Sequence, residues 1–113
     1  MSWRAQGMRT WLLQRLTAIY MLLYGIGFAV YISCQTVTDY ASWHALFVHP
    51  FANIATLMFF LSILYHAWVG IRDILIDYVK WSSIRFILWT MVTALLIALG
   101  VWVTMILYSV VVI

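Results

Sequence analysis

The fold of this chain is decided by residues 86–113, FILWTMVTALLIALGVWVTMILYSVVVI, a stretch without any charged side chain. A helix needs about 20 consecutive, mostly apolar residues to cross the hydrocarbon core of a bilayer. This stretch is long enough, so the sequence predicts a membrane-spanning helix over roughly residues 86–108.

A second charge-free stretch covers residues 16–38 and predicts another span over roughly residues 11–33. Arg15 falls in the first turn of this span. Two interpretations of Arg15 are about equally favoured there. Its long side chain can snorkel to the interface, or its guanidinium can serve a polar network or an anionic ligand at that depth.

The third charge-free stretch, residues 40–71, is too long to be one span. Pro50 is the only proline, and it suits the first turn of a helix because its missing N–H would have no partner there. We therefore expect a span over roughly residues 50–71 and a connector before it, with a short interfacial helix. The whole chain, residues 1–113, is then one all-helical membrane domain with three spans.

Composition supports the same class. The chain is 67% hydrophobic and only 8% charged, whereas soluble domains are about 25% charged. This excludes an ordinary soluble domain, a disordered chain and a soluble nucleic-acid binder, so no nucleic-acid partner is expected. A single cysteine, Cys34, excludes an internal disulfide and a cysteine-based metal cluster.

The basic residues predict the orientation, because Lys and Arg are enriched in cytoplasmic loops of membrane proteins. All six lie before the first span or between the second and third: Arg4, Arg9, Arg15, Arg72, Lys80 and Arg85. The loop between the first two spans has none, and neither has the C-terminal segment. We expect a cytoplasmic N-terminus and a periplasmic C-terminus.

His66 is the first candidate for chemistry. It lies inside the second span, where an ionisable side chain is costly and is therefore a functional-site hypothesis. For a lone membrane histidine, a neutral ring that only hydrogen-bonds across a helix interface is slightly favoured over a functional role. Ser62 and Gly70, one turn away on the same face, change the balance, because small residues admit a helix or the edge of a porphyrin. Histidine is a common axial ligand of haem.

The other histidines cannot complete a haem site with His66. His44 and His49 fall in the connector, where a solvated imidazole is the simpler interpretation. His49 lies seventeen residues before His66, about 25 Å along one helix. If His66 binds haem iron, the second ligand must come from another polypeptide.

Asp77 and Tyr78 form a polar pair that we expect just after the second span, in a loop from Arg72 to Arg85. A phenol beside a carboxylate can donate a hydrogen bond to a quinone carbonyl and help to deliver protons. The simpler interpretation is favoured by the residues alone: Tyr78 is an interfacial anchor, and Asp77 caps the helix or pairs with a base. Asp73 is expected to balance the adjacent Arg72.

At His66 the sequence resembles a known family. Residues 61–80, LSILYHAWVGIRDILIDYVK, are similar to the signature of the small hydrophobic membrane anchor, the cytochrome b small subunit, of bacterial succinate dehydrogenase. The runs HAW-x-G and D-Y-V-K stand at the family's spacing, and residues 15–19, RLTAI, resemble the family's R-x-T-A-I. The sequence departs from the pattern at Trp81, where relatives carry proline.

The resemblance implies a membrane-anchor component of succinate:ubiquinone oxidoreductase in the bacterial inner membrane. It implies that His66 is one axial ligand of a haem b whose iron is also ligated by a second, sister membrane anchor. Tyr78 would hydrogen-bond ubiquinone, Asp77 would line the same site, and Arg15 would lie near the haem propionates. Succinate would be oxidised on the flavoprotein partner, with electrons passing through the iron–sulfur partner, so this chain alone would be inactive.

Two alternatives remain open on the sequence. One is a small structural or transport-type membrane protein in which His66 packs helices or relays protons. The other is a haem anchor of another respiratory enzyme, such as fumarate reductase. A transporter would be expected to carry an acidic residue within a span, whereas Asp39, Asp73 and Asp77 are all expected outside.

Overall fold

In the computed structural model, which describes residues 2–112 and the side chains of residues 7–112, the chain is entirely helical. Three long helices and one short helix follow one another: α1 (Ser2–Ser33), α2 (Tyr40–Val48), α3 (Pro50–Tyr78) and α4 (Ser82–Val112). The parts of the long helices that could cross a membrane are Gly7–Ser33, Pro50–Tyr78 and Ser82–Val112. The prediction of an all-α protein with three spans is confirmed.

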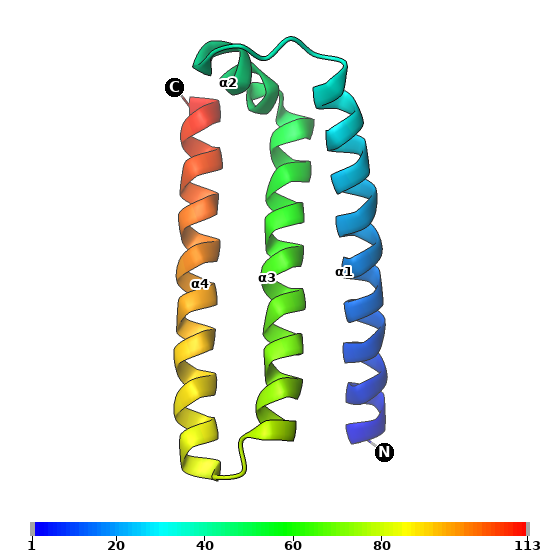
Figure 1. Cartoon of the computed structure of the whole chain (residues 1–113), viewed down its shortest axis with the longest axis vertical. Helices are drawn as coiled ribbons and strands as arrows, with labels where there is room; N and C mark the ends of the chain where they lie inside the picture. Colours follow the sequence, from blue (N-terminus) through cyan, green and yellow to red (C-terminus); the bar gives the residue numbers. More distant parts are fainter. Residues whose placement is uncertain (1, 113) are drawn as a thin grey trace.

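The long helices lie side by side in one row, with α3 in the middle (Figure 1). Within the described residues, α3 contacts both α1 and α4, while α1 and α4 do not contact each other. The chain termini lie at opposite ends of the row, as an odd number of spans requires. Which end faces the cytoplasm stays a prediction from the basic residues.

The short helix α2 lies across one end of the row, against α3 and α4. Asp39 begins it with a capping box, because the Asp39 side chain accepts from Ser42 N and the Ser42 side chain accepts from the Asp39 backbone. Pro50 stands at the start of α3, as its missing N–H predicts. Asn53 ties the elements together by donating to Phe47 O in α2 and to Leu107 O in α4, both at 3.0 Å.

The polar loop expected from Arg72 to Arg85 is much shorter in the structure. α3 continues through Asp77 and Tyr78, and only residues 79–81 separate it from α4. Residues 72–78 contain neither Gly nor Pro, so nothing in their backbone preferences ends the helix at the first charged residue. The expectation that Asp77 and Tyr78 follow the end of the helix is therefore wrong.

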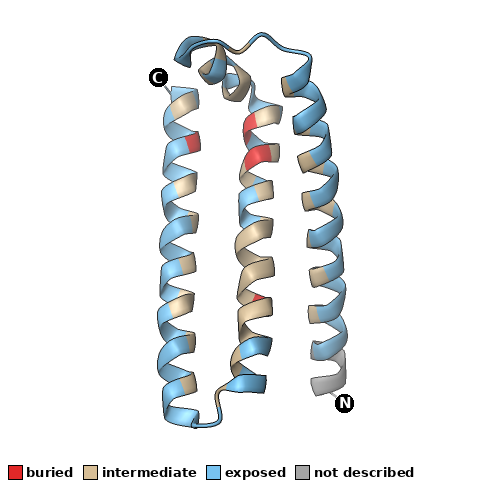
Figure 2. Cartoon of the chain, in the orientation of Figure 1, coloured by how far each residue is buried: buried red, intermediate tan, exposed pale blue. Residues whose placement is uncertain are grey.

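Most of the surface is apolar and exposed. Among the described side chains four are buried: Asn53, Thr56 and Val69 on α3, and Leu107 on α4. Figure 2 shows α1 and α4 largely exposed and α3, between them, largely intermediate. A soluble chain could not leave so many large apolar side chains uncovered. The row of helices is suited to lipid and to further protein chains on its faces.

Candidate functional site around His66

His66 lies on α3, on the side that meets α1, and is half-buried. Its Nδ1 atom lies 3.3 Å from the hydroxyl oxygen of Thr17 on α1. One turn earlier on α1, the Gln14 amide donates to the backbone carbonyl of His66 at 3.3 Å. One face of α1 therefore contacts both the ring and the backbone of this histidine.

The second ring nitrogen of His66, Nε2, has no hydrogen-bond partner among the described residues. Two small residues, Ser62 and Gly70, lie one turn before and after His66 on the same face of α3. A methyl group added at Gly70 would meet no atom within 4 Å, so there is open space at Gly70.

Arg15 does not join this group in the structure. It is exposed, and its guanidinium lies 5.4 Å from the ring centre of Trp11 on the same helix. At about 100° per residue, Arg15 points away from the α1 face that carries Gln14 and Thr17. The contact is a cation–π interaction of the kind found at exposed positions.

The second candidate group lies at the other end of α3 from α2, in the last turn of the helix. Tyr78 is 79% exposed, and Asp77 beside it is exposed as well. Tyr78 borders a pocket of about 390 Å³ that is lined by Tyr78, Val79, Lys80, Trp81 and Ile84. The lining combines the phenol of Tyr78 and the ammonium group of Lys80 with apolar side chains.

Tyr78 and His66 belong to separate sites on the same helix. Twelve residues separate them, which is about 18 Å along the axis. Asp77 lies three turns beyond His66 on the same face, whereas Tyr78 is turned by about a third of a revolution. Asp73, between them, pairs with Arg72 at 3.2 Å, as expected. Among the described residues no ion pair involves Asp77.

The histidines near α2 are far from this site. The Nδ1 atom of His49 accepts from Phe51 N at the start of α3, and His44 packs against the ring of Tyr40. Their roles in the structure are local. No group of three or more His, Cys, Asp or Glu side chains in the described part of the chain is placed to hold a metal ion. A haem iron does not need such a group, because the porphyrin supplies four of its ligands.

Sequence reasoning missed the polar side chains that join α1 to α3. Besides Gln14 and Thr17, these are Tyr20, which donates to Ala55 O at 2.7 Å, and Tyr24, whose hydroxyl lies 2.5 Å from that of Thr56. The sequence does carry a signal for these contacts, because an uncharged polar side chain recurs at every third or fourth position of this apolar span. Such residues often hydrogen-bond between membrane helices.

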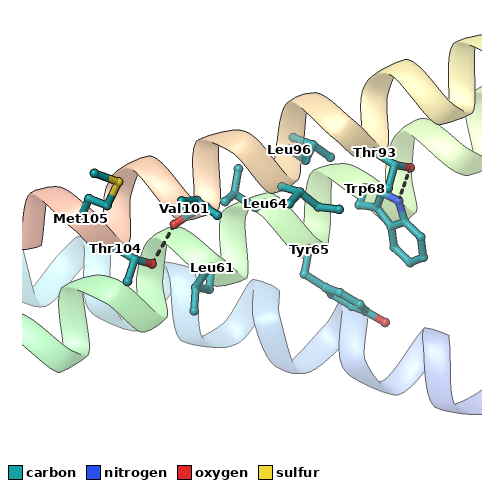
Figure 3. Close-up of a pocket in the computed structure, with 11 residues that line it drawn as sticks. Leu61, Leu64, Tyr65, Trp68, Thr93, Leu96, Val101, Thr104 and Met105 are labelled. Atoms are coloured by element: carbon teal, nitrogen blue, oxygen red, sulfur yellow. Dashed lines mark hydrogen bonds between the residues drawn. The ribbon is translucent and has the colours of Figure 1, made fainter. Parts of the chain in front are cut away.

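The opposite side of α3 faces α4 and is nearly apolar. There the Trp68 indole donates to the Thr93 hydroxyl at 3.0 Å, and Trp68 stacks near Trp89. Figure 3 shows Trp68 and Thr93 turned toward each other at one end of a largely apolar groove of about 600 Å³ between α3 and α4. This side offers few groups that could act on a ligand.

Comparison with known proteins identifies the family. The sequence profile of the family described as succinate dehydrogenase/fumarate reductase transmembrane subunit matches residues 1–112. The chain belongs to this family. It is also 41% identical over 97 residues to the succinate dehydrogenase hydrophobic membrane anchor subunit of Coxiella burnetii (strain RSA 493 / Nine Mile phase I), covering 86% of this chain and 84% of that protein.

Family membership confirms the resemblance noted in the sequence and the multi-pass membrane location. It identifies the chain as a membrane anchor of the succinate dehydrogenase/fumarate reductase type. A stand-alone structural or transport-type protein is no longer needed as an explanation. The bacterial relative agrees with a location in a bacterial inner membrane.

Proposed function

We propose that this chain anchors a succinate:ubiquinone oxidoreductase, binds haem b through His66 and contributes to the site where ubiquinone is reduced. The observation that carries the proposal is His66 itself, an imidazole within an apolar span whose Nδ1 atom lies 3.3 Å from the Thr17 hydroxyl oxygen and whose Nε2 atom has no hydrogen-bond partner among the described residues. Succinate, rather than fumarate, is favoured by the name of the similar Coxiella burnetii protein.

The surroundings of His66 fit an axial haem ligand. A neutral imidazole is the form that binds iron. Ser62 and Gly70 leave room for the edge of a flat macrocycle on the same face. A bound haem supplies one-electron redox chemistry, whereas the residues of this chain orient the ring, exclude water and set the electrostatic surroundings.

The second axial ligand must come from another chain. The spans α1 and α4 contain no histidine, and His44 and His49 lie at the far end of α3. A sister membrane anchor packed against the exposed faces of the row would supply the ligand and complete a helix bundle. The redox enzyme further requires an iron–sulfur partner, which passes electrons to the quinone, and a flavoprotein partner, on which succinate is oxidised.

Tyr78 is the residue through which this chain would act on ubiquinone. Its exposed hydroxyl can donate a hydrogen bond to a quinone carbonyl oxygen, which becomes more basic as it gains electrons. Asp77, one residue away and unpaired among the described residues, can help to supply protons to the same oxygen. The basic residues near this end predict that it faces the cytoplasm, where the soluble partners would dock.

Arg15 has a weaker case as a ligand for the haem propionates. Its guanidinium is on the same half of the row as His66, but it lies over Trp11 and not toward the histidine. A rotation of its flexible side chain would be needed to reach a carboxylate. An arginine–carboxylate contact is strong and often bidentate, which would compensate for leaving the ring.

The haem proposal is tested by isolating the complex in mild detergent through a tag on this chain. We expect a flavoprotein and an iron–sulfur protein to co-purify, and the dithionite-reduced minus oxidised spectrum to show a b-type haem. His66→Ala should remove or alter that spectrum, whereas His44→Ala should not. A wild-type preparation that is colourless and free of partners would contradict the proposal, as would a spectrum that His66→Ala leaves unchanged.

The quinone proposal is tested with Tyr78→Phe, which removes only the hydroxyl. We expect succinate:quinone activity to fall by about 10²-fold or more, because a group that donates a hydrogen bond or proton in the rate-limiting step typically contributes that much. Succinate oxidation with a soluble dye as acceptor should be retained. Tyr108→Phe, at the opposite end of the row, is the matched control. Equal activity of Tyr78→Phe and wild type with quinone would remove Tyr78 from the site.

A further inference from the structure

The contacts of Thr17 bear on which nitrogen of His66 carries its proton. The Thr17 hydroxyl donates to Gln14 O at 3.0 Å, and its oxygen lies 3.3 Å from His66 Nδ1. A hydroxyl has a single proton and two acceptor lone pairs. Both contacts are hydrogen bonds at the same time only when the Thr17 hydroxyl donates to the Gln14 carbonyl and accepts from the ring, which places the ring hydrogen on Nδ1.

From this geometry we infer that Thr17 is a positioning residue for haem binding, acting through His66. With the proton on Nδ1, the lone pair of a neutral imidazole is on Nε2, the nitrogen that is free of other partners among the described residues. The hydrogen bond thus selects the tautomer that can ligate iron and fixes the plane of the ring. This inference rests on the proposed role of His66 as a haem ligand.

Gln14 supports the same arrangement from one turn away. Its amide donates to the backbone carbonyl of His66, so α1 holds both the main chain and the ring of the histidine. The two contacts come from positions three residues apart, which share one face of α1.

The contact also has an electronic consequence. A histidine that donates its second N–H to an acceptor becomes a more basic ligand. A more basic ligand stabilises ferric iron more than ferrous iron and therefore lowers the midpoint potential. Removing the acceptor at position 17 should raise the potential. The ratio of the ligand's affinities for ferric and ferrous iron should change by at most about tenfold. A larger change would exceed the net free energy that one hydrogen bond usually contributes.

The test uses the assembled complex with Thr17→Val, which keeps the shape of the side chain and removes the hydroxyl. We expect an optical redox titration to give a haem midpoint potential above that of the wild type. Thr17→Ser keeps the acceptor and should restore the wild-type value. Thr104→Val is the matched control, because Thr104 also donates to a carbonyl of its own helix, at Gly100, but lies on α4 away from His66.

Each outcome decides the inference. A raised potential in Thr17→Val with recovery in Thr17→Ser supports it, and loss of haem from Thr17→Val with retention in Thr17→Ser supports it equally. If Thr17→Val does not assemble, Thr17→Cys replaces it, because sulfur is only a weak acceptor. An unchanged potential in a haem-loaded Val or Cys variant overturns the role of Thr17 while leaving His66 as a ligand. Loss of the His66 assignment itself is detected separately by His66→Ala.

Discussion

The two sides of α3 are built differently. Toward α1, the contacts include a series of hydrogen bonds from Gln14, Thr17, Tyr20 and Tyr24. Toward α4, two hydrogen bonds cross the interface, from Asn53 to Leu107 O and from Trp68 to Thr93. Much of the remaining contact is apolar, and the helices come together at Gly100, where an added methyl group would lie 3.4 Å from Leu64 Cδ1. The α1–α3 interface is the richer in side-chain hydrogen bonds, and the α3–α4 interface depends more on shape.

This difference has a physical explanation. Lipid tails are as apolar as leucine, so burial of aliphatic surface does not by itself hold two membrane helices together. Close packing next to a small residue supplies dispersion contacts at the α3–α4 interface. Hydrogen bonds add direction, and they fix the rotation of α1 about its axis. The interface that contacts His66 is the one that carries more of the side-chain hydrogen bonds.

The largest loss of stability is expected when the space at Gly100 is filled, which tests whether shape specifies the α3–α4 interface. In Gly100→Val the first added carbon lies at ordinary contact distance, 3.4 Å from Leu64 Cδ1 and 3.8 Å from Leu61 Cδ2, so the two further methyl groups are the ones that press on these leucines. Overpacking of this kind typically costs about 1–3 kcal/mol. The thermal midpoint of the detergent-purified complex should fall clearly.

Gly27→Val is the control for this substitution. Gly27 is on α1, and a methyl group added there meets nothing within 4 Å in this chain. The same replacement of glycine by valine should then change the thermal midpoint little unless a partner covers that position. A complex with Gly100→Val that is as stable as the wild type would show that the α3–α4 interface is loose and that shape does not specify it.

A smaller effect is expected at the α1–α3 interface from Tyr20→Phe. This change removes the 2.7 Å hydrogen bond to Ala55 O and leaves the ring in place. Hydrogen bonds between membrane helices are worth about 0.6 kcal/mol on average, so the thermal midpoint should drop slightly. Tyr31→Phe, at an exposed position of α1, provides the comparison. If the two variants were equally stable, directional bonds would not distinguish this interface from the other.

The three spans could be predicted from the sequence because it contains charge-free stretches of the required length. Pro50 located the start of α3 for an equally local reason. The rotation of each helix about its axis was not predictable, since it depends on which faces meet. For that reason the expectation for His66 could include Ser62 and Gly70, which share its helix, but not Thr17 and Gln14, which belong to another.

The end of α3 shows the same limit. The first charged residue after an apolar stretch marks where hydrocarbon gives way to water, but it does not mark where a helix ends. Arg72 and Asp73 are compatible with a helix and pair with each other at 3.2 Å. The helix therefore carries Asp77 and Tyr78 to its last turn, which fixes their directions relative to His66. A flexible loop would not have done so.

The smallest effect concerns Asp39, which lies outside both interfaces and caps the helix that crosses the end of the row. The hydrogen bond from Ser42 N, followed by that from the Ser42 hydroxyl, holds the pKa of Asp39 below its ordinary value of 3.8. A carboxyl group whose pKa is lowered by folding stabilises the folded form above its unfolded pKa, and this stabilisation is lost as the pH falls through the folded value. The start of α2 should therefore be fully capped at neutral pH and should fray only in acid.

Asp39→Asn keeps a capping group that does not titrate. We expect amide hydrogen exchange at the start of α2 to differ little between Asp39→Asn and wild type at pH 7, and the wild type to exchange faster relative to the variant as the pH falls below about 4. A ratio of exchange rates that is constant with pH would show that the Asp39 charge does not hold the cap.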